Sequence, residues 1–139
     1  MARDHRGLKA FELADRLALA MYQYTRSFPR AEAFGLTSQL RRAAVSIPSN
    51  IVEGCARHTE QDYLRFLDAA YGSARELEYQ LSLATRLGYL DSNAVADLIP
   101  LSKEVGRVLF RLIEAIRYPE RRHKKSRPQA GQSTACGSN

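Results

Sequence analysis

The sequence predicts an all-α protein, an antiparallel up-down-up-down four-helix bundle, on three observations. Four stretches repeat apolar residues every three or four positions, and none shows the strict alternation of a half-buried strand. Proline, glycine or capping residues stand where these stretches begin and end. The length of 139 residues, 45% of them hydrophobic, suits one globular domain. Short connections after the second and third stretches then force antiparallel neighbours, with the bundle over residues 8–117.

The first predicted helix spans residues 8–28 and follows a flexible N-terminus of residues 1–7. Pro29 ends this helix, because proline cannot donate the next backbone hydrogen bond. The second predicted helix spans residues 36–57, and its apolar stripe continues in register through Pro48. We therefore expect a kink or a local widening at Pro48, and not a break.

The third predicted helix spans residues 60–87, with Thr59 as N-cap and Asp62 where a capping box places its acid. Gly88 is placed to end it in a left-handed conformation.

The fourth predicted helix spans residues 92–117 and starts at Asp91 or Ser92. Pro100 is a second candidate kink inside it. Residues 118–139 are basic and then rich in Gly, Ser, Ala and Gln, so we expect a disordered tail.

The net charge of +6 is unevenly distributed. From Arg117 onward there are six Lys and Arg against one acid, which leaves 15 basic and 14 acidic side chains in residues 1–116. The bundle is nearly neutral, and the basicity belongs to the tail. Net charge therefore gives little reason to expect that the whole bundle surface attracts nucleic acid.

Several features predict a cytoplasmic protein without a membrane segment. The longest apolar run, Leu17 to Tyr22, is far shorter than the ~20 residues of a membrane span. The N-terminal residues do not have the pattern of a secretory signal. Cys55 and Cys136 lie in a core-like segment and in the tail, which fits reduced thiols better than a disulfide.

A polar stripe runs along the second predicted helix. Its short hydrogen-bonding side chains suit a partly buried network or a subunit contact, although a merely solvated face is equally compatible. The stripe consists of Gln39, Arg42, Ser46, Asn50 and Glu53.

Antiparallel pairing of the second and third helices gives a testable register, in which facing residue numbers add up to about 118. Arg42 then faces Glu76, and Glu53 faces Arg65. Such ion pairs fix register more reliably than they add stability.

Small residues also lie in the middle of the third helix. A glycine there costs ~1 kcal/mol relative to alanine. Gly72 and Ser73 therefore suggest close helix approach within the bundle or between subunits, or else ordinary tolerance of one glycine.

The sequence offers no enzymatic constellation, so we predict no catalytic residues, no cofactor, no metal and no small-molecule substrate. A di-iron bundle requires Glu-x-x-His pairs on facing helices, and of the three histidines, His5, His58 and His123, only His123 has a Glu three residues before it, in the predicted tail. There is also no metal-spaced Cys/His set, no glycine-rich phosphate loop and no nucleophile elbow.

Two motifs carry a family resemblance. Residues 36–54 read LTSQLRRAAVSIPSNIVEG and residues 66–78 read FLDAAYGSARELE. In this order they resemble the 23S ribosomal RNA intervening-sequence proteins, over residues 8–117. One departure is Tyr71, where the family commonly has arginine, which removes a positive charge from that helix. The resemblance implies a bundle that assembles into a homo-oligomer, often a pentamer, with no known reaction, and distant relatives that bind nucleic acid.

Two functions remain open: an accessory protein that binds RNA or DNA, and a scaffold that self-assembles without nucleic acid. The first would use basic side chains on the second helix, beyond it and in the tail. The candidates are Arg41, Arg57, Arg121, Arg122, Lys124, Lys125 and Arg127. The second would use the polar stripe and the small residues at Gly72 and Ser73.

Overall fold

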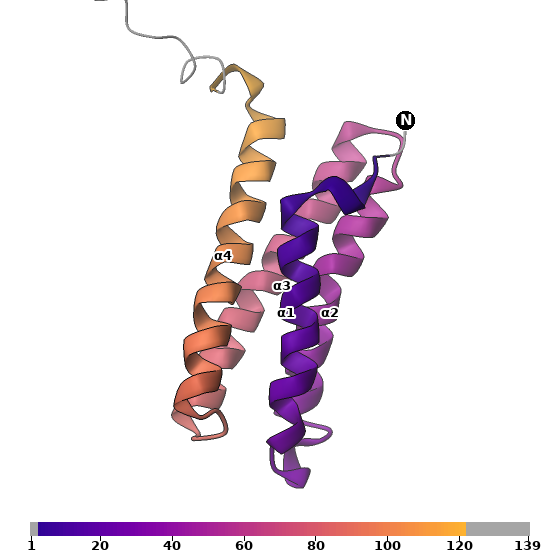
Figure 1. Ribbon diagram of the computed structural model, residues 1–139. Coiled ribbons are helices and arrows are strands. Elements are labelled where there is room, and N and C mark those ends of the chain that lie inside the picture. The colour runs from indigo at the N-terminus through magenta and orange to yellow at the C-terminus, as the bar shows by residue number, and fades with distance from the viewer. Residues whose placement is uncertain (1–2, 122–139) are drawn as a thin grey trace, which may run out of the picture.

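The computed structural model describes residues 3–121, which form four long helices and no strand. In Figure 1 the chain runs down α1, up α2, down α3 and up α4, and each helix packs against two neighbours. The all-α prediction is confirmed. The elements are η1 (His5–Gly7), α1 (Lys9–Tyr24), η2 (Thr25–Ser27), η3 (Arg30–Glu32), α2 (Leu36–Cys55), α3 (Glu60–Arg86) and α4 (Ser92–Arg117).

One hydrophobic core runs along the bundle axis, because each helix turns its apolar stripe inward. Leu17, Leu40, Leu67 and Leu109, one from each helix, are completely buried within it. No helix among residues 3–121 is long and apolar enough to cross a membrane.

The predicted capping residues act as expected. The Thr59 hydroxyl accepts a hydrogen bond from the Asp62 backbone N–H at 3.1 Å, and the Asp91 carboxylate accepts one from the Ala94 N–H at 2.8 Å. Gly88 has a φ of +76°, the left-handed value that ends a helix without a Cβ clash. These caps set the start of α3 and both sides of the α3–α4 turn.

The first helix ends earlier than predicted. Regular α-helix stops at Tyr24, and Thr25–Ser27 form a tighter 3₁₀ turn. Phe28 is already extended, at φ −65° and ψ 151°, because the ring of the following Pro29 excludes the helical conformation. The proline therefore changes the conformation of the residues before it. Residues 25–28 were predicted to be α-helical, and that prediction is wrong.

Internal prolines do not break the other helices. α2 continues through Pro48, which is buried, and α4 continues through Pro100. The expectation of unbroken helices is confirmed.

The described part of the N-terminus is held in place, so the prediction of a flexible segment is wrong for residues 3–7. The Arg3 backbone N–H donates to the Cys55 carbonyl at 2.8 Å, and its guanidinium lies 4.1 Å from the centre of the Tyr63 ring. His5 packs edge-on against Phe11, with 4.6 Å between ring centres. This segment covers the buried α2–α3 end of the bundle.

The chain also stays ordered just beyond α4. Residues 118–121 were expected to be disordered, but Arg121 folds back to pair with Glu114 at 3.2 Å and lies 4.5 Å from the Tyr118 ring centre. The rest of the predicted tail, with its candidates, lies outside the described residues; those candidates are Arg122, Lys124, Lys125 and Arg127.

Candidate functional site

Part of the polar stripe on α2 forms a hydrogen-bonded network with α3. The hydroxyl oxygens of Ser46 and Ser73 lie 2.9 Å apart, in agreement with the predicted register. The Asn50 amide donates to the Ser46 carbonyl at 2.8 Å and to its hydroxyl at 3.0 Å. These residues are half-buried, so this stretch is a network between helices and not a merely solvated face.

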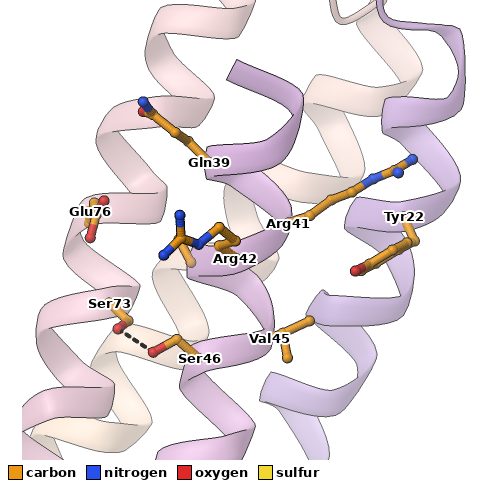
Figure 2. Close-up of a pocket in the computed structure, with 9 residues that line it drawn as sticks. Tyr22, Gln39, Arg41, Arg42, Val45, Ser46, Ser73 and Glu76 are labelled. Carbon is orange, nitrogen blue, oxygen red and sulfur yellow. Dashed lines mark hydrogen bonds between the residues drawn. The ribbon is translucent and has the colours of Figure 1, made fainter. Parts of the chain in front are cut away.

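A groove of about 730 Å³ lies beside this network (Figure 2). Gln39, Arg42 and Ser46 line it from α2, and Ser73 and Glu76 line it from α3. Arg42 and Glu76 are therefore on the same side of the bundle, as predicted. Within residues 3–121, however, Arg42 has no carboxylate within 4.0 Å, so the predicted ion pair with Glu76 does not form.

The second predicted ion pair is also wrong. Glu53 pairs with Arg57 at 3.5 Å, and Arg65 pairs with Asp62 at 3.7 Å. Partners three or four residues away on the same helix are already adjacent, whereas reaching across to the next helix requires ordering two long exposed side chains. The register is therefore held by short groups and packing, and not by these charges.

The glycine at the close helix contact is Gly54, and not Gly72. A Cβ at position 54 would stand 2.9 Å from Phe66 Cβ and 3.3 Å from Tyr63 Cδ2. A Cβ at Gly72 would meet nothing within 4 Å, so the prediction of close approach within the bundle is wrong there. The sequence alone does not single out Gly54, because its close contact is with Phe66 and Tyr63 on another helix.

The three predicted nucleic-acid residues that lie in the described part of the chain are not brought together. Arg41 is half-buried, donates to the Thr25 hydroxyl at 2.9 Å and stacks on Tyr22 at 4.6 Å, so its guanidinium is held against α1 and the turn after it. Arg57 is bound to Glu53 and lies 5.0 Å from the centre of the Phe66 ring, beside the α2–α3 turn. Arg121 pairs with Glu114 on α4. These three cations do not form one surface.

A basic surface instead lies along α3 and α4, over two adjoining hollows of about 510 and 450 Å³. We call it the α3–α4 surface. Among residues 3–121, Glu78 is the one acid that lines these two hollows. Its cations are Arg75, Arg86, Lys103, Arg107 and Arg111.

Ion pairing neutralises part of this charge. Arg75 pairs with Glu78 at 3.2 Å, and Arg107 with Glu104 at 2.7 Å. The guanidinium of Arg107 lowers the pKa of the Glu104 carboxyl. In the described part of the chain, Arg86, Lys103 and Arg111 have no carboxylate within 4.0 Å.

Two aromatic side chains stand among these cations. Tyr79 of α3 is 62% exposed and Phe110 of α4 is 51% exposed. Tyr63, Phe66, Tyr71 and Tyr79 recur at helical spacing in the sequence, which favours core positions for all four. That expectation fails for Tyr79, because it lies off the buried face of α3, which passes through Leu77, Leu81 and Ala84.

The described residues contain neither a clustered set of metal ligands nor a cysteine with a lowered pKa. No group of three or more His, Cys, Asp or Glu side chains within residues 3–121 is arranged to hold a metal ion. Burial raises the pKa of the Cys55 thiol and raises the pKa of Tyr63 beside it to about 12. Both groups are therefore neutral at pH 7, and a protonated, buried thiol is a poor nucleophile.

Comparison with known proteins agrees with the motifs. Residues 6–111 match the family model of the 23S rRNA-intervening sequence protein. A crystal structure of a protein with unknown function from the S23 ribosomal protein family of Bacteroides thetaiotaomicron VPI-5482 shares the fold. Its TM-score is 0.69 at 24% identity, over 76% of this chain and 95% of that chain. No curated protein matches. This chain belongs to the 23S rRNA-intervening sequence protein family.

Proposed function

We propose that this chain is a non-enzymatic, oligomeric accessory protein that binds RNA or DNA. The observation that carries the proposal is the α3–α4 surface, where five cations face one lining acid. Residues 1–116 carry 15 basic and 14 acidic side chains, so this surface concentrates charge that the bundle otherwise balances. A local cluster of Lys and Arg is the electrostatic pattern that phosphate backbones require.

The membership of a 23S rRNA-intervening sequence family is compatible with this proposal, although that name describes a gene's location in some members and not a ligand. Contacts with phosphates release condensed counterions, so binding should weaken as salt rises. An oligomer would repeat the α3–α4 surface in each subunit and increase avidity for a long strand.

A charge-removal variant tests the proposal. We expect Arg86→Gln, Lys103→Gln and Arg111→Gln together to weaken binding of a 20-nucleotide fluorescent RNA or DNA roughly tenfold or more at low salt, and to flatten the salt dependence. Fluorescence anisotropy between 50 and 200 mM NaCl measures both. The matched control, Arg16→Gln, Arg26→Gln and Arg30→Gln, removes the same charge from α1 and the loop after it. Equal losses in both variants, or no binding by the unmodified protein, would contradict the proposal.

A second candidate is a scaffold that self-assembles without nucleic acid. It is favoured by apolar side chains exposed on α1 and α2: Leu19 is 61% exposed and Val45 is 39% exposed. Phe34, in the loop before α2, is fully exposed. Exposed large apolar groups on a small protein can mark an interface.

Sedimentation of the nuclease-treated protein tests this candidate. We expect an oligomer, with a pentamer implied by the family resemblance, that shifts toward monomer in a Leu19→Ser, Phe34→Ser variant. A monomer at micromolar concentration in the unmodified protein would rule out the scaffold.

A further inference from the structure

We propose that the α3–α4 surface takes single-stranded nucleic acid, with bases stacked on Tyr79 and Phe110 and phosphates held by the flanking cations. This inference rests on the proposed function, since it names the class of ligand for the same surface. It goes further than the proposed function because cations alone would bind a duplex as well as a single strand.

The first observation is the exposure of the two rings. A surface that only neutralised phosphates would need no aromatic side chains, yet Tyr79 is 62% exposed and Phe110 is 51% exposed. Phe110 packs against Tyr71 with 6.0 Å between ring centres, so it is held in position while half of it stays exposed. Aromatic rings displayed in this way are the usual platforms on which unpaired bases stack.

The second observation is that cations and rings share the same hollows. Tyr79, Arg75, Arg86 and Lys103 line one hollow, and Phe110 lines the other with Arg75, Lys103 and two further arginines. Each nucleotide of a single strand offers one flat apolar base and one phosphate. The surface therefore offers rings on which the bases can stack and cations that can bind the phosphates.

The third observation is spacing along the helix. Tyr79 lies eight residues after Tyr71, the residue that Phe110 packs against, which is about 12 Å at 1.5 Å per residue. Stacked bases rise about 3.4 Å each, so roughly three to four nucleotides would span the two rings. Arg75 lies between them on α3, where it can meet the intervening backbone.

A duplex fits these observations less well. Its bases are paired and stacked on one another, so their faces are closed to side chains outside, and only its phosphates could be used. Both rings would then remain exposed in the complex. An acidic peptide would satisfy the cations, but it has no repeating flat group to cover Tyr79 and Phe110.

The test compares a 12-nucleotide single-stranded oligo-U with a 12-base-pair RNA duplex by fluorescence anisotropy at 100 mM NaCl. We expect the unmodified protein to prefer the single strand. Tyr79→Ala with Phe110→Ala should weaken single-strand binding roughly ten- to a hundredfold and leave duplex binding unchanged. Tyr22→Ala, which removes a ring that is 45% exposed on α1, is the matched control and should change neither. Thermal melting followed by circular dichroism establishes that each variant is folded.

The outcomes separate the inference from the proposed function. Equal affinity for both ligands, or equal losses on both in the Tyr79→Ala, Phe110→Ala variant, would overturn the inference and leave nucleic-acid binding intact. Binding of neither RNA, or binding only of an acidic peptide such as poly-glutamate, would overturn both. Ultraviolet crosslinking to oligo-U should recover peptides that contain Tyr79 or Phe110, and crosslinks confined to other helices would also overturn the inference.

Discussion

The two sides of α3 differ in what they do. On the side toward α2, Gly54 brings α2 against Phe66, and the Ser46–Ser73 hydrogen bond closes the contact. On the side toward α4, the same helix displays Tyr79 among cations over open hollows. One side of α3 is built for packing, and the other leaves side chains exposed to solvent.

The residues that identify the family and the residues that we propose bind nucleic acid lie on different sides of α3. The motifs at residues 36–54 and 66–78 lie along the packed α2–α3 contact, so they identify the fold. Of the five cations on the α3–α4 surface, only Arg75 lies inside a motif. Family members can therefore share the bundle and still differ on the surface that we propose binds nucleic acid.

The largest expected effect is at the packed contact. We expect Gly54→Val to lower the free energy of unfolding by about 3 kcal/mol, because even a Cβ would stand 2.9 Å from Phe66 Cβ and the backbones must separate. Urea denaturation followed by circular dichroism measures this loss.

Gly72→Val is the matched control, since it makes the same substitution in the interior of α3, where a Cβ meets nothing within 4 Å. Its unfolding free energy should stay within about 0.5 kcal/mol of the unmodified protein. If both variants lost the same stability, the α2–α3 contact would not be the tight one.

The next effect is a loss of stability in alkali. Burial raises the pKa of Tyr63 to about 12 in the folded protein, from its ordinary value of 10.0. The pKa of Tyr63 is therefore higher in the folded protein than in the unfolded chain. The contribution of the neutral Tyr63 side chain to the free energy of unfolding is complete below pH 10 and is lost as the pH rises toward 12. The loss should be on the order of 2 kcal/mol, at 1.36 kcal/mol per unit.

Tyr63→Phe removes the titrating hydroxyl and should flatten the dependence of stability on pH between 10 and 12. Tyr24 and Tyr89 also have raised pKa values, and they contribute equally to both proteins. Urea midpoints at pH 9, 10, 11 and 12 measure the difference, and an unchanged slope in Tyr63→Phe would place the alkaline sensitivity elsewhere.

Local sequence signals predicted the parts of the fold that depend on few residues. The caps at Thr59 and Asp91 and the left-handed Gly88 each depend on a short segment, and all three are confirmed. The α2–α3 register also followed from a short connection and two apolar stripes. Such features require no knowledge of distant contacts.

Predictions failed where the contact partner of a side chain depends on the three-dimensional structure. The N-terminal segment looked flexible because Arg3 finds Cys55 and Tyr63 only after α2 and α3 have packed. Glu53 and Arg65 were expected to pair across helices, but each has a nearer partner on its own helix. The α3–α4 surface combines residues from two helices, so no single stretch of sequence displays it.

A smaller effect distinguishes packing from hydrogen bonding as the source of the register. In a double-mutant cycle of Ser46→Ala and Ser73→Ala, we expect a coupling of about 0.5–1 kcal/mol, the net value of one half-buried hydrogen bond. Urea denaturation of the four proteins measures it. A coupling near zero would assign the register to the apolar contacts and to Gly54 alone.

The smallest effect on stability belongs to the α3–α4 surface. Arg86, Lys103 and Arg111 are exposed side chains, so replacing all three by Gln should change the unfolding free energy by less than about 0.5 kcal/mol. The same variant is the one expected to lose nucleic-acid binding. Surface charges that contribute binding without stability are free to vary among proteins that share the bundle, whereas Gly54 is not. A variant that unfolds more easily, with no change in binding, would mean that these cations hold α3 against α4, and the two sides of α3 would then serve the same purpose.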